Sequence, residues 1–264
     1  PDVAVAACYL EGFAPGDGVR WLDAAAAIRD RGGAVVLYLA GRTRAGEDAA
    51  ASHTAAIAGD YAAGRALAER AGVLVADTLD DFTDLVMLSV LLRERPVAGC
   101  KLGAASNAGF ECVAVADHLG SLELASLSAA TRTALARQLD EAGIGEIVAV
   151  RNPLDVTPIT GDAVFAGVVA SILGDRSVDV GLAGIVPFTP ALETGPESTE
   201  GGGIQERLIE LWADTTKPWV TVVDAGRRYD GFCVALAVAG IPVFRTADRA
   251  ARMLGRYCEW RSRR

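Results

Sequence analysis

Short apolar runs alternate along this chain with longer segments in which apolar residues recur at helical spacing. In the first part of the chain, the apolar runs predict three strands and the intervening segments predict three helices. The expected strands cover 2–10, 34–40 and 73–76, and the expected helices cover 19–31, 59–71 and 79–93. Strands that alternate with helices in this way indicate βαβ units, in which helices cover a parallel sheet.

The alternation continues after RERP at 93–96, a basic segment with proline that we interpret as a boundary between two units, 1–95 and 96–264. Expected strands of the second unit cover 99–106, 122–126, 146–150, 179–186, 218–223 and 241–245. Its expected helices cover 110–119, 129–142, 161–173, 203–214, 230–239 and 247–260. The predicted fold class is α/β, with two flavodoxin-like parallel-sheet units. Three strands are few for such a sheet, so we expect the first unit to be incomplete at its N-terminus.

The composition allows a large core, because 51% of the 264 residues are hydrophobic and 22% are charged. A formal net charge of -9 argues against a nucleic acid partner, since neutralising phosphates requires clustered lysine and arginine. No apolar run reaches the roughly 18 residues that cross a membrane, and the N-terminal segment lacks the pattern of a secretory leader. We expect a soluble cytoplasmic protein with no membrane partner.

The cysteines and the acidic segments do not predict a metal site. The five cysteines are Cys8, Cys100, Cys112, Cys233 and Cys258. Their number is odd and no two have the spacing of a zinc site or a redox pair, so we expect buried, reduced thiols. The acidic segment DTLDDFTD at 77–84 suits a helix N-terminus with acids in its first turn better than a metal site, and we therefore expect none.

One long segment has the features of a functional loop. GRTRAGEDAAASHTAAIAG at 41–59 is rich in small residues, contains His53 and is expected to be a loop. Loops of this length in compact domains are usually functional. The segment follows a strand, and open α/β sheets bind ligands beyond the carboxyl ends of their strands. Small neighbouring side chains would let another molecule or protein surface approach the imidazole closely.

Within this loop, SHTAAIAG at 52–59 resembles the SHTGALAG loop of ADP-forming acyl-CoA synthetases. The related succinyl-CoA synthetase α subunit carries a shorter version of this loop, GHAGAI. The resemblance extends over nearly the whole chain, through YLEGFAPGDGVRWLDAA at 9–25, SNAGFECVAVAD at 106–117 and NPLDVTPITGD at 152–162. It implies that His53 accepts a phosphoryl group and that Glu11 supplies a carboxylate to the phosphohistidine. A carboxylate on one imidazole nitrogen fixes the tautomer, leaves the other nitrogen as nucleophile and stabilises the ring when phosphorylation makes it cationic.

The resemblance also implies residues that bind phosphate. They are Ser52, Thr54, Asn107, Ala108 and Gly109. The Asn-Ala-Gly turn could equally be a tight strand-to-helix connection in which glycine eases the bend. Asn152 and Asp155 are candidate supporting residues, although Asn-Pro commonly starts a turn and Asp155 could cap the segment that follows.

The chain departs from the family pattern at two places. Ala55 replaces a glycine, and a left-handed backbone at this position would be strained with a side chain. Phe110 and Glu111 replace Gly-Pro in the turn whose helix N-terminus should meet the phosphoryl group. Free backbone N–H groups favour an anion there, and the Glu111 carboxylate could take this place itself and repel phosphate.

For the complete enzyme, the resemblance implies that acyl-CoA and phosphate give an acyl phosphate, that the histidine takes the phosphoryl group, and that its loop delivers the group to ADP. The reverse reaction forms acyl-CoA. The expected cofactors are CoA and ATP or ADP with Mg2+, bound mainly by a CoA-binding domain and an ATP-grasp domain or subunit outside this chain. The expected substrate is a small acyl compound.

We accordingly expect the chain to belong to an acid-CoA ligase, to be inactive in isolation and to self-associate through the open edge of its first unit. Two alternatives stay open. The chain could be a degenerate, non-catalytic scaffold module of the same fold. It could also be a relative that uses this scaffold for another acyl or carbamoyl transfer.

Overall fold

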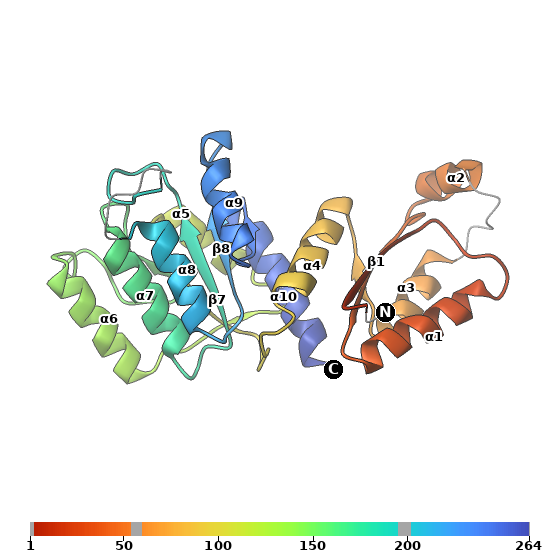
Figure 1. Ribbon diagram of the computed structural model, residues 1–264, viewed down its shortest axis with the longest axis horizontal. Helices are drawn as coiled ribbons and strands as arrows, with labels where there is room; N and C mark the ends of the chain where they lie inside the picture. The colour runs from red at the N-terminus through yellow and green to blue at the C-terminus, as the bar shows by residue number, and fades with distance from the viewer. Residues whose placement is uncertain (1–2, 54–59, 195–201, 264) are drawn as a thin grey trace. The chain divides into compact units, whose positions relative to one another are not determined.

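The computed structural model describes residues 3–53, 60–194 and 202–263, which form two compact units (Figure 1). The first unit ends at Val90, and the second runs from Leu91 to Arg263. Each is built on a parallel sheet flanked by helices, which confirms the predicted α/β fold class. The predicted domain limits, 1–95 and 96–264, stay predictions.

The first unit contains a three-stranded parallel sheet with the order β1-β2-β3. The strands are β1 (Val5–Leu10), β2 (Ala34–Leu39) and β3 (Leu74–Ala76). The helices are α1 (Asp17–Asp30), α2 (Arg44–His53), α3 (Tyr61–Arg70) and α4 (Leu79–Leu91). The central strand β2 is almost wholly buried, whereas β1 alternates between half-buried and exposed residues from Ala6 onwards. This alternation is typical of an edge strand with one covered face.

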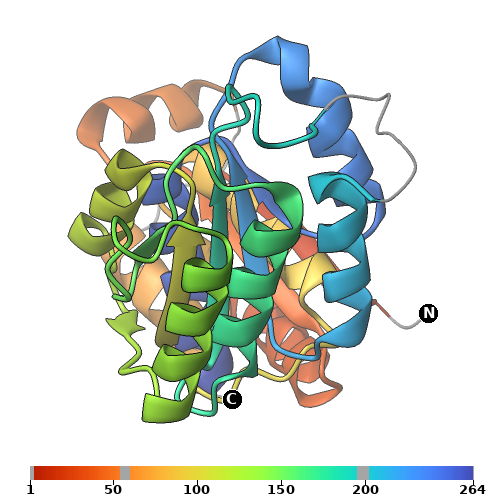
Figure 2. The same cartoon turned by 90° about the vertical axis from the view of Figure 1, so that its left-hand side faces the viewer.

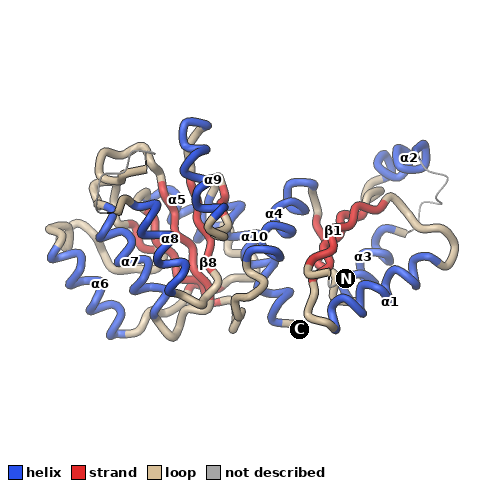
Figure 3. The backbone as a smooth tube through the Cα atoms, viewed as in Figure 1, coloured by secondary structure: helices blue, strands red, loops and turns tan. Residues whose placement is uncertain are grey.

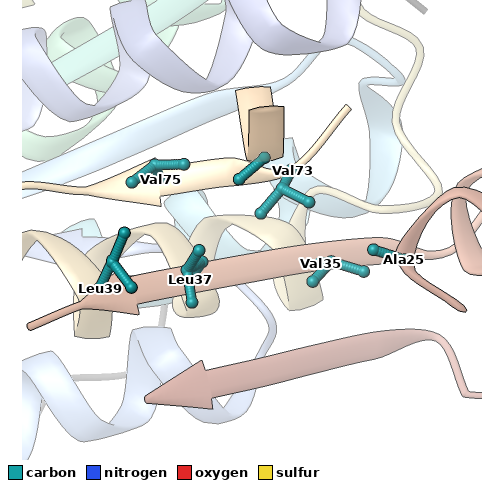
Figure 4. Close-up of a cluster of buried hydrophobic side chains, with 7 residues drawn as sticks. Ala25, Val35, Leu37, Leu39, Val73 and Val75 are labelled. Atoms are coloured by element: carbon teal, nitrogen blue, oxygen red, sulfur yellow. The ribbon is translucent and has the colours of Figure 1, made fainter. Parts of the chain in front are cut away.

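One face of this sheet makes a hydrophobic core with α1 and α3 (Figure 4). The buried members of the core are Ala25, Val35, Leu37, Leu39, Ala68, Val73 and Val75. Alternate residues of β2 supply its centre, as the period of two in a strand requires. Helix α4 lies on the opposite side of the strands from α1 and α3, and its Leu85 and Leu88 are completely buried (Figure 1).

The structure corrects the expectation that 41–59 is a loop, because Arg44–His53 forms the helix α2. Thr43 starts this helix: its hydroxyl accepts a hydrogen bond from the Gly46 N–H at 3.2 Å, and its carbonyl accepts one from the Glu47 N–H at 2.8 Å. Alanine, the best helix former, is the commonest residue in the segment. Figure 3 shows α2 beyond the ends of the strands, apart from the helices that cover the sheet.

The second unit is built on a parallel sheet with the order β5-β4-β7-β8-β9, and β6 also pairs with β4. Its strands are β4 (Lys101–Ser106), β5 (Glu123–Leu124), β6 (Leu154–Asp155), β7 (Val180–Ile185), β8 (Trp219–Val223) and β9 (Val243–Phe244). Its helices are α5 (Gly109–Asp117), α6 (Ala129–Glu141), α7 (Asp162–Gly174), α8 (Ile204–Asp214), η1 (Arg227–Tyr229), α9 (Asp230–Val238) and α10 (Ala247–Ser262). Figure 2 shows α6, α7 and α8 in front of the strands and α10 behind them. The sheet is therefore covered on both faces, as parallel sheets usually are.

The expected strand at 146–150 is wrong. The N–H groups of Ile147 and Val148 both bond to the carbonyl of Ile144, at 3.1 and 3.0 Å, so this segment is a turn. The strand that pairs with β4 there is β6, a few residues later. Two further expected strands, 122–126 and 241–245, are reduced to the short pairs β5 and β9.

No helix in the described part of the chain is long and apolar enough to cross a membrane. Among the described residues, no group of three or more histidine, cysteine, aspartate or glutamate side chains is placed to bind a metal ion. All five cysteines are free thiols, but the expectation that they are buried holds only for Cys258. The other four are half-buried.

Candidate functional site

A pocket of about 110 Å3 lies in the first unit beyond the carboxyl ends of β1 and β2. The segments that follow the two strands line it, together with α2 and the start of α3. The lining residues are Glu11, Gly12, Phe13, Leu39, Ala40, Gly41, Glu47, Ala50, Asp60, Tyr61 and Gly64. Gly41 has a φ of 83°, a left-handed conformation that favours glycine and lets the chain turn from β2 towards α2. The pocket thus occupies the position where open α/β sheets bind ligands.

Glu11 is the first residue after β1, and its side chain is half-buried at the wall of this pocket. Its Oε1 accepts a hydrogen bond from the hydroxyl of Tyr9 at 3.1 Å. The Tyr9 ring stacks on Tyr38 of the neighbouring strand, with 5.6 Å between ring centroids and 9° between ring planes. The predicted carboxylate therefore lines a pocket, with one oxygen engaged by a phenol.

Two further acids line the pocket, and each is held by its own helix. Glu47 of α2 forms an ion pair with Arg44, with 3.5 Å between Oε2 and Nη1. Asp60 precedes α3, and its Oδ1 caps this helix by accepting the Ala63 N–H at 3.1 Å. The ion pair and the cap each stabilise the start of a helix, which explains the presence of Glu47 and Asp60 at these positions.

The structure places His53 as the last residue of α2, three residues after Ala50, which lines the pocket. Ser52 lies in the same last turn. The side chains of Ser52 and His53 lie outside what the structure describes, and so do Thr54 and Ala55 altogether. The structure thus brings the end of α2 and Glu11 to one end of the sheet, while the phosphate-binding roles of Ser52 and Thr54 stay predictions.

In the second unit, Asn107, Ala108 and Gly109 form the turn from β4 to α5, as the sequence predicts. The Asn107 side chain is buried and bonds to both backbone groups of Val186, accepting its N–H at 2.8 Å and donating to its carbonyl at 3.0 Å. The Ala108 N–H donates to the hydroxyl of Ser106 at 3.0 Å. Of the predicted phosphate-binding groups in this turn, the Asn107 amide and the Ala108 N–H are therefore engaged within the protein.

Asn152 completes the edge of the sheet between β5 and β6. Its side-chain amide accepts the Ala104 N–H at 3.0 Å and donates to the carbonyls of Leu102 and Ala125, at 2.7 and 2.9 Å. It therefore replaces a strand residue in the ladder along β4. Asp155 accepts the Thr157 N–H at 2.9 Å, and a Cβ on Gly109 would lie 2.8 Å from its Oδ2. Both candidate supporting residues contact β4 or the turn that follows it.

Glu111 lies in the first turn of α5 and is completely buried. Its Oε2 accepts a hydrogen bond from the Ser106 hydroxyl, and its Oε1 has no partner among the described residues. Burial and the charge of Asp224 together raise its pKa to about 7, although the Ser106 bond acts in the opposite direction. Gly184 of β7 makes room for this carboxyl, because a Cβ there would clash with Oε2. The side chain thus points to the sheet, between Ser106 of β4 and Gly184 of β7.

Comparison with known proteins matches residues 1–89 to the family model described as the succinyl-CoA ligase like flavodoxin domain. The chain is 32% identical over 247 residues to subunit alpha of the ADP-forming acetate–CoA ligase II of Pyrococcus furiosus. This match covers 93% of the chain and 51% of the relative. The first unit thus matches the succinyl-CoA ligase like flavodoxin domain, and the chain as a whole is similar to part of an ADP-forming acid–CoA ligase.

A second similar protein is a trans-feruloyl-CoA synthase from an unknown prokaryotic organism, 27% identical over 98% of the chain and 35% of the relative. The fold is that of an acetyl-coenzyme A synthetase from Ca. Korarchaeum cryptofilum, described as dinucleotide forming and solved with phosphate and ADP. That comparison has a TM-score of 0.82 at 23% identity and covers 99% of the chain and 55% of the solved one. The chain thus spans about half, or less, of the relatives it matches.

Several residues around the pocket and beside α5 were not found from the sequence. At the pocket they are Glu47, which lines it, and Tyr9, which bonds to the lining residue Glu11. Beside α5 they are Ser106, Gly184 and Asp224. Ser106 and Tyr9 each lie at a strand end, within a segment that carries the family resemblance, which was the one available signal. Gly184 and Asp224 are far along the chain from Glu111, so only the sheet order brings them together.

Proposed function

We propose that this chain carries the phosphohistidine of an ADP-forming acid–CoA ligase and that His53 is the residue transiently phosphorylated. The observation that carries the proposal is the pocket beyond β1 and β2. Glu11 lines it from one side, and α2 contributes Ala50 less than one helical turn before His53. The match of residues 1–89 to the succinyl-CoA ligase like flavodoxin domain, and the similarity to an ADP-forming acetate–CoA ligase subunit, support the same assignment.

The proposed chemistry transfers one phosphoryl group twice. The lone pair of a neutral His53 nitrogen attacks the phosphorus of an acyl phosphate, the bond from phosphorus to the acyl oxygen breaks, and the acid leaves as a carboxylate. The Glu11 carboxylate accepts the N–H of the other ring nitrogen and stabilises the positive charge of the phosphorylated ring. An oxygen of ADP then attacks the same phosphorus, the N–P bond breaks, and ATP leaves with neutral His53 restored.

The size and charge of the pocket favour the imidazole ring as its occupant. Ligand pockets for drug-sized molecules measure about 300–1,000 Å3, so a pocket of about 110 Å3 is too small for CoA or a nucleotide. Three acids, Glu11, Glu47 and Asp60, line it. Carboxylates attract a ring that donates an N–H and becomes cationic, and they repel a phosphoryl group. We therefore propose that this pocket serves the imidazole ring and does not bind the phosphoryl group.

In the second unit, we propose that the N-terminus of α5 binds phosphate. The N-cap residue Ala108 has no side chain that could satisfy the first N–H groups of the helix. Such groups, together with the helix dipole, favour an anion. Asn107, Asn152 and Asp155 would then act by holding the strand-to-helix turn, because their hydrogen bonds are with the protein itself.

The remaining parts of the reaction would be supplied by the complete enzyme. We propose that CoA, and ATP or ADP with Mg2+, bind mainly on a CoA-binding domain and an ATP-grasp domain or subunit, and that the protein is cytoplasmic. The relatives are consistent with such partners, because the chain spans 51% of one and 35% of another, and the first is itself called a subunit. A covalent phosphohistidine is what allows the CoA and nucleotide sites to be separate.

Labelling with radioactive ATP and Mg2+ tests the proposal. The full-length protein should acquire a label that is labile in acid and stable in base, as an N-phosphoryl bond is. His53→Asn should abolish the label, whereas His118→Asn, which changes the second of the two histidines, should retain it. The chain 1–264 alone should not be labelled. A full-length protein that binds ATP and stays unlabelled would overturn the catalytic proposal.

The second candidate function is a non-catalytic scaffold of the same fold. The observation that favours it is the buried carboxyl of Glu111 in the first turn of α5, since an ionised acid at this position opposes anion binding. Under this alternative, the full-length protein would bind its partner domains and ATP but would never carry a phosphoryl label.

A further inference from the structure

Tyr9 and Tyr38 form a stacked pair on neighbouring strands of the first unit. The parallel register places Tyr9 directly beside Tyr38, and their rings lie 5.6 Å apart with only 9° between their planes. The Tyr9 side chain belongs to the face opposite the hydrophobic core, since Cys8 and Leu10 face the core. Tyr9 is 52% exposed, so ring stacking rather than burial fixes its orientation.

The hydroxyl of this oriented ring donates to Oε1 of Glu11 at 3.1 Å. Residues two apart in an extended segment point to the same side, which brings Tyr9 and Glu11 together at the end of β1. This hydrogen bond is the main cause of the raised pKa of the Tyr9 hydroxyl, as expected for a phenol that donates to a carboxylate. The contact is thus charge-assisted and directional.

This contact distinguishes Glu11 from the two other acids of the pocket. Glu47 pairs with Arg44 and Asp60 caps α3, so each is held by its own helix. Glu11 lies on no regular element, and without Tyr9 its side chain would lose rotamer restriction. When the phenol holds Oε1, Oε2 keeps a defined direction in which it can accept an N–H from an imidazole ring.

We propose that Tyr9 is a positioning residue that holds the Glu11 carboxylate in the orientation in which it supports His53. The inference rests on the proposed function of His53 and Glu11, and it adds a residue which acts on the reaction through Glu11 alone. Tyr38 contributes through its ring, because its hydroxyl has no hydrogen-bond partner among the described residues.

The test compares Tyr9→Phe with Tyr38→Phe in the full-length protein. Each variant removes one hydroxyl and keeps the stacked rings. In single-turnover labelling of His53 from ATP, Tyr9→Phe should lower the phosphorylation rate about threefold to tenfold, with the same dependence on ATP concentration as the wild type. Tyr38→Phe should match the wild type. Equal thermal midpoints for the two variants would confirm that both are folded.

A double-mutant cycle with Glu11→Gln separates positioning from a general structural effect. Glu11→Gln alone should slow labelling about tenfold or more, because the neutral amide cannot stabilise a cationic ring. In that background, Tyr9→Phe should add less than about twofold, since the charge it orients is gone. If Tyr9→Phe slows labelling equally in both backgrounds, or not at all, the inference is overturned while the role of His53 stands. A wild type that is never labelled overturns both.

Discussion

At the scale of single residues, Glu111 shows how a departure from a family pattern is accommodated. Its carboxyl lies against the sheet, where Ser106 donates to one oxygen and the other has no described partner. The titratable groups nearby are Asp224 after β8 and Cys112 on the same helix. Neither of them carries a positive charge, so among these neighbours only the Ser106 hydroxyl favours the ionised form.

We predict that Glu111 makes the stability of the second unit depend on pH. Its pKa is about 7 in the folded protein, against 4.5 for a glutamate in water, which represents the unfolded chain. A raised acid pKa contributes stability that is fully present below 4.5 and lost as pH rises through about 7. The difference corresponds to about 3 kcal/mol in the free energy of unfolding. Glu111→Gln should remove this pH dependence.

Thermal unfolding of the wild type and of Glu111→Gln at several values between pH 4.5 and 8 would measure the effect. The quantity compared is the slope of stability against pH. Glu146→Gln is the matched control, because Glu146 is an exposed acid of the same unit. Parallel pH profiles for the wild type and Glu111→Gln would show that the folded protein does not perturb this carboxyl.

At the scale of elements, strand β7 and helix α5 approach closely at one glycine. Gly184 is paired with Ser106 of β4 in the parallel ladder. A Cβ on Gly184 would clash with the Glu111 carboxyl and would lie 2.9 Å from the Cβ of Ser106. Neither neighbour can withdraw freely, because the side chains of Ser106 and Glu111 are both buried. The absence of a side chain at Gly184 therefore leaves the space that the buried carboxyl of Glu111 occupies.

We predict that Gly184→Ala destabilises the second unit by about 1–3 kcal/mol, the range for overpacking a filled core. Gly174→Ala, at the end of α7, should be neutral, since nothing lies within 4 Å of its Cβ position. Chemical denaturation of both variants measures the difference. Adding Glu111→Ala should recover part of the loss from Gly184→Ala, because it removes the carboxyl that the new methyl group meets. Equal stabilities of the two alanine variants would contradict this packing.

At the scale of the whole molecule, the open edge of β1 has consequences for association. Among the described residues β1 pairs with β2 alone, which leaves one row of its backbone groups unpaired. Val3 and Tyr9, near its two ends, are 48% and 52% exposed. Edges of this kind recruit further chains unless charges or bulges block them. β1 contains neither a charged residue nor a proline.

We predict that the chain 1–264 self-associates through β1. Sedimentation velocity at micromolar concentration should show species larger than the monomer. Ala7→Lys, which places a charge on an exposed position of β1, should shift the population towards the monomer. Ala62→Lys, an equally exposed position on α3, is the control and should leave association unchanged. A chain that begins at Val97 should be monomeric. A strictly monomeric 1–264 would show that β1 is covered.

The sequence by itself determined the parallel α/β architecture and most of the long elements, because buried strands and amphipathic helices carry their period in the order of apolar residues. It indicated a resemblance to ADP-forming acyl-CoA synthetases through the segment around His53 and the segments around Glu11, Asn107 and Asn152. The short strands could not be predicted correctly from the sequence. Nothing local shows that the amide of Asn152 replaces a strand residue beside β4, or that 146–150 turns instead of pairing.

Only the tertiary structure decided what these side chains contact. Asn107 is engaged by Val186, Glu111 by Ser106 and Gly184, and Glu11 by a tyrosine that stacks on the next strand. These contacts join strands and loops that are distant in sequence and that the sheet order brings together. This holds for Gly184, for Tyr38 and for Val186, the partner of Asn107. Local periodicity records which face of an element is buried, but it holds no information about which neighbour covers it. For this reason the elements could be predicted, whereas the contacts around Glu11 and around Glu111 could not.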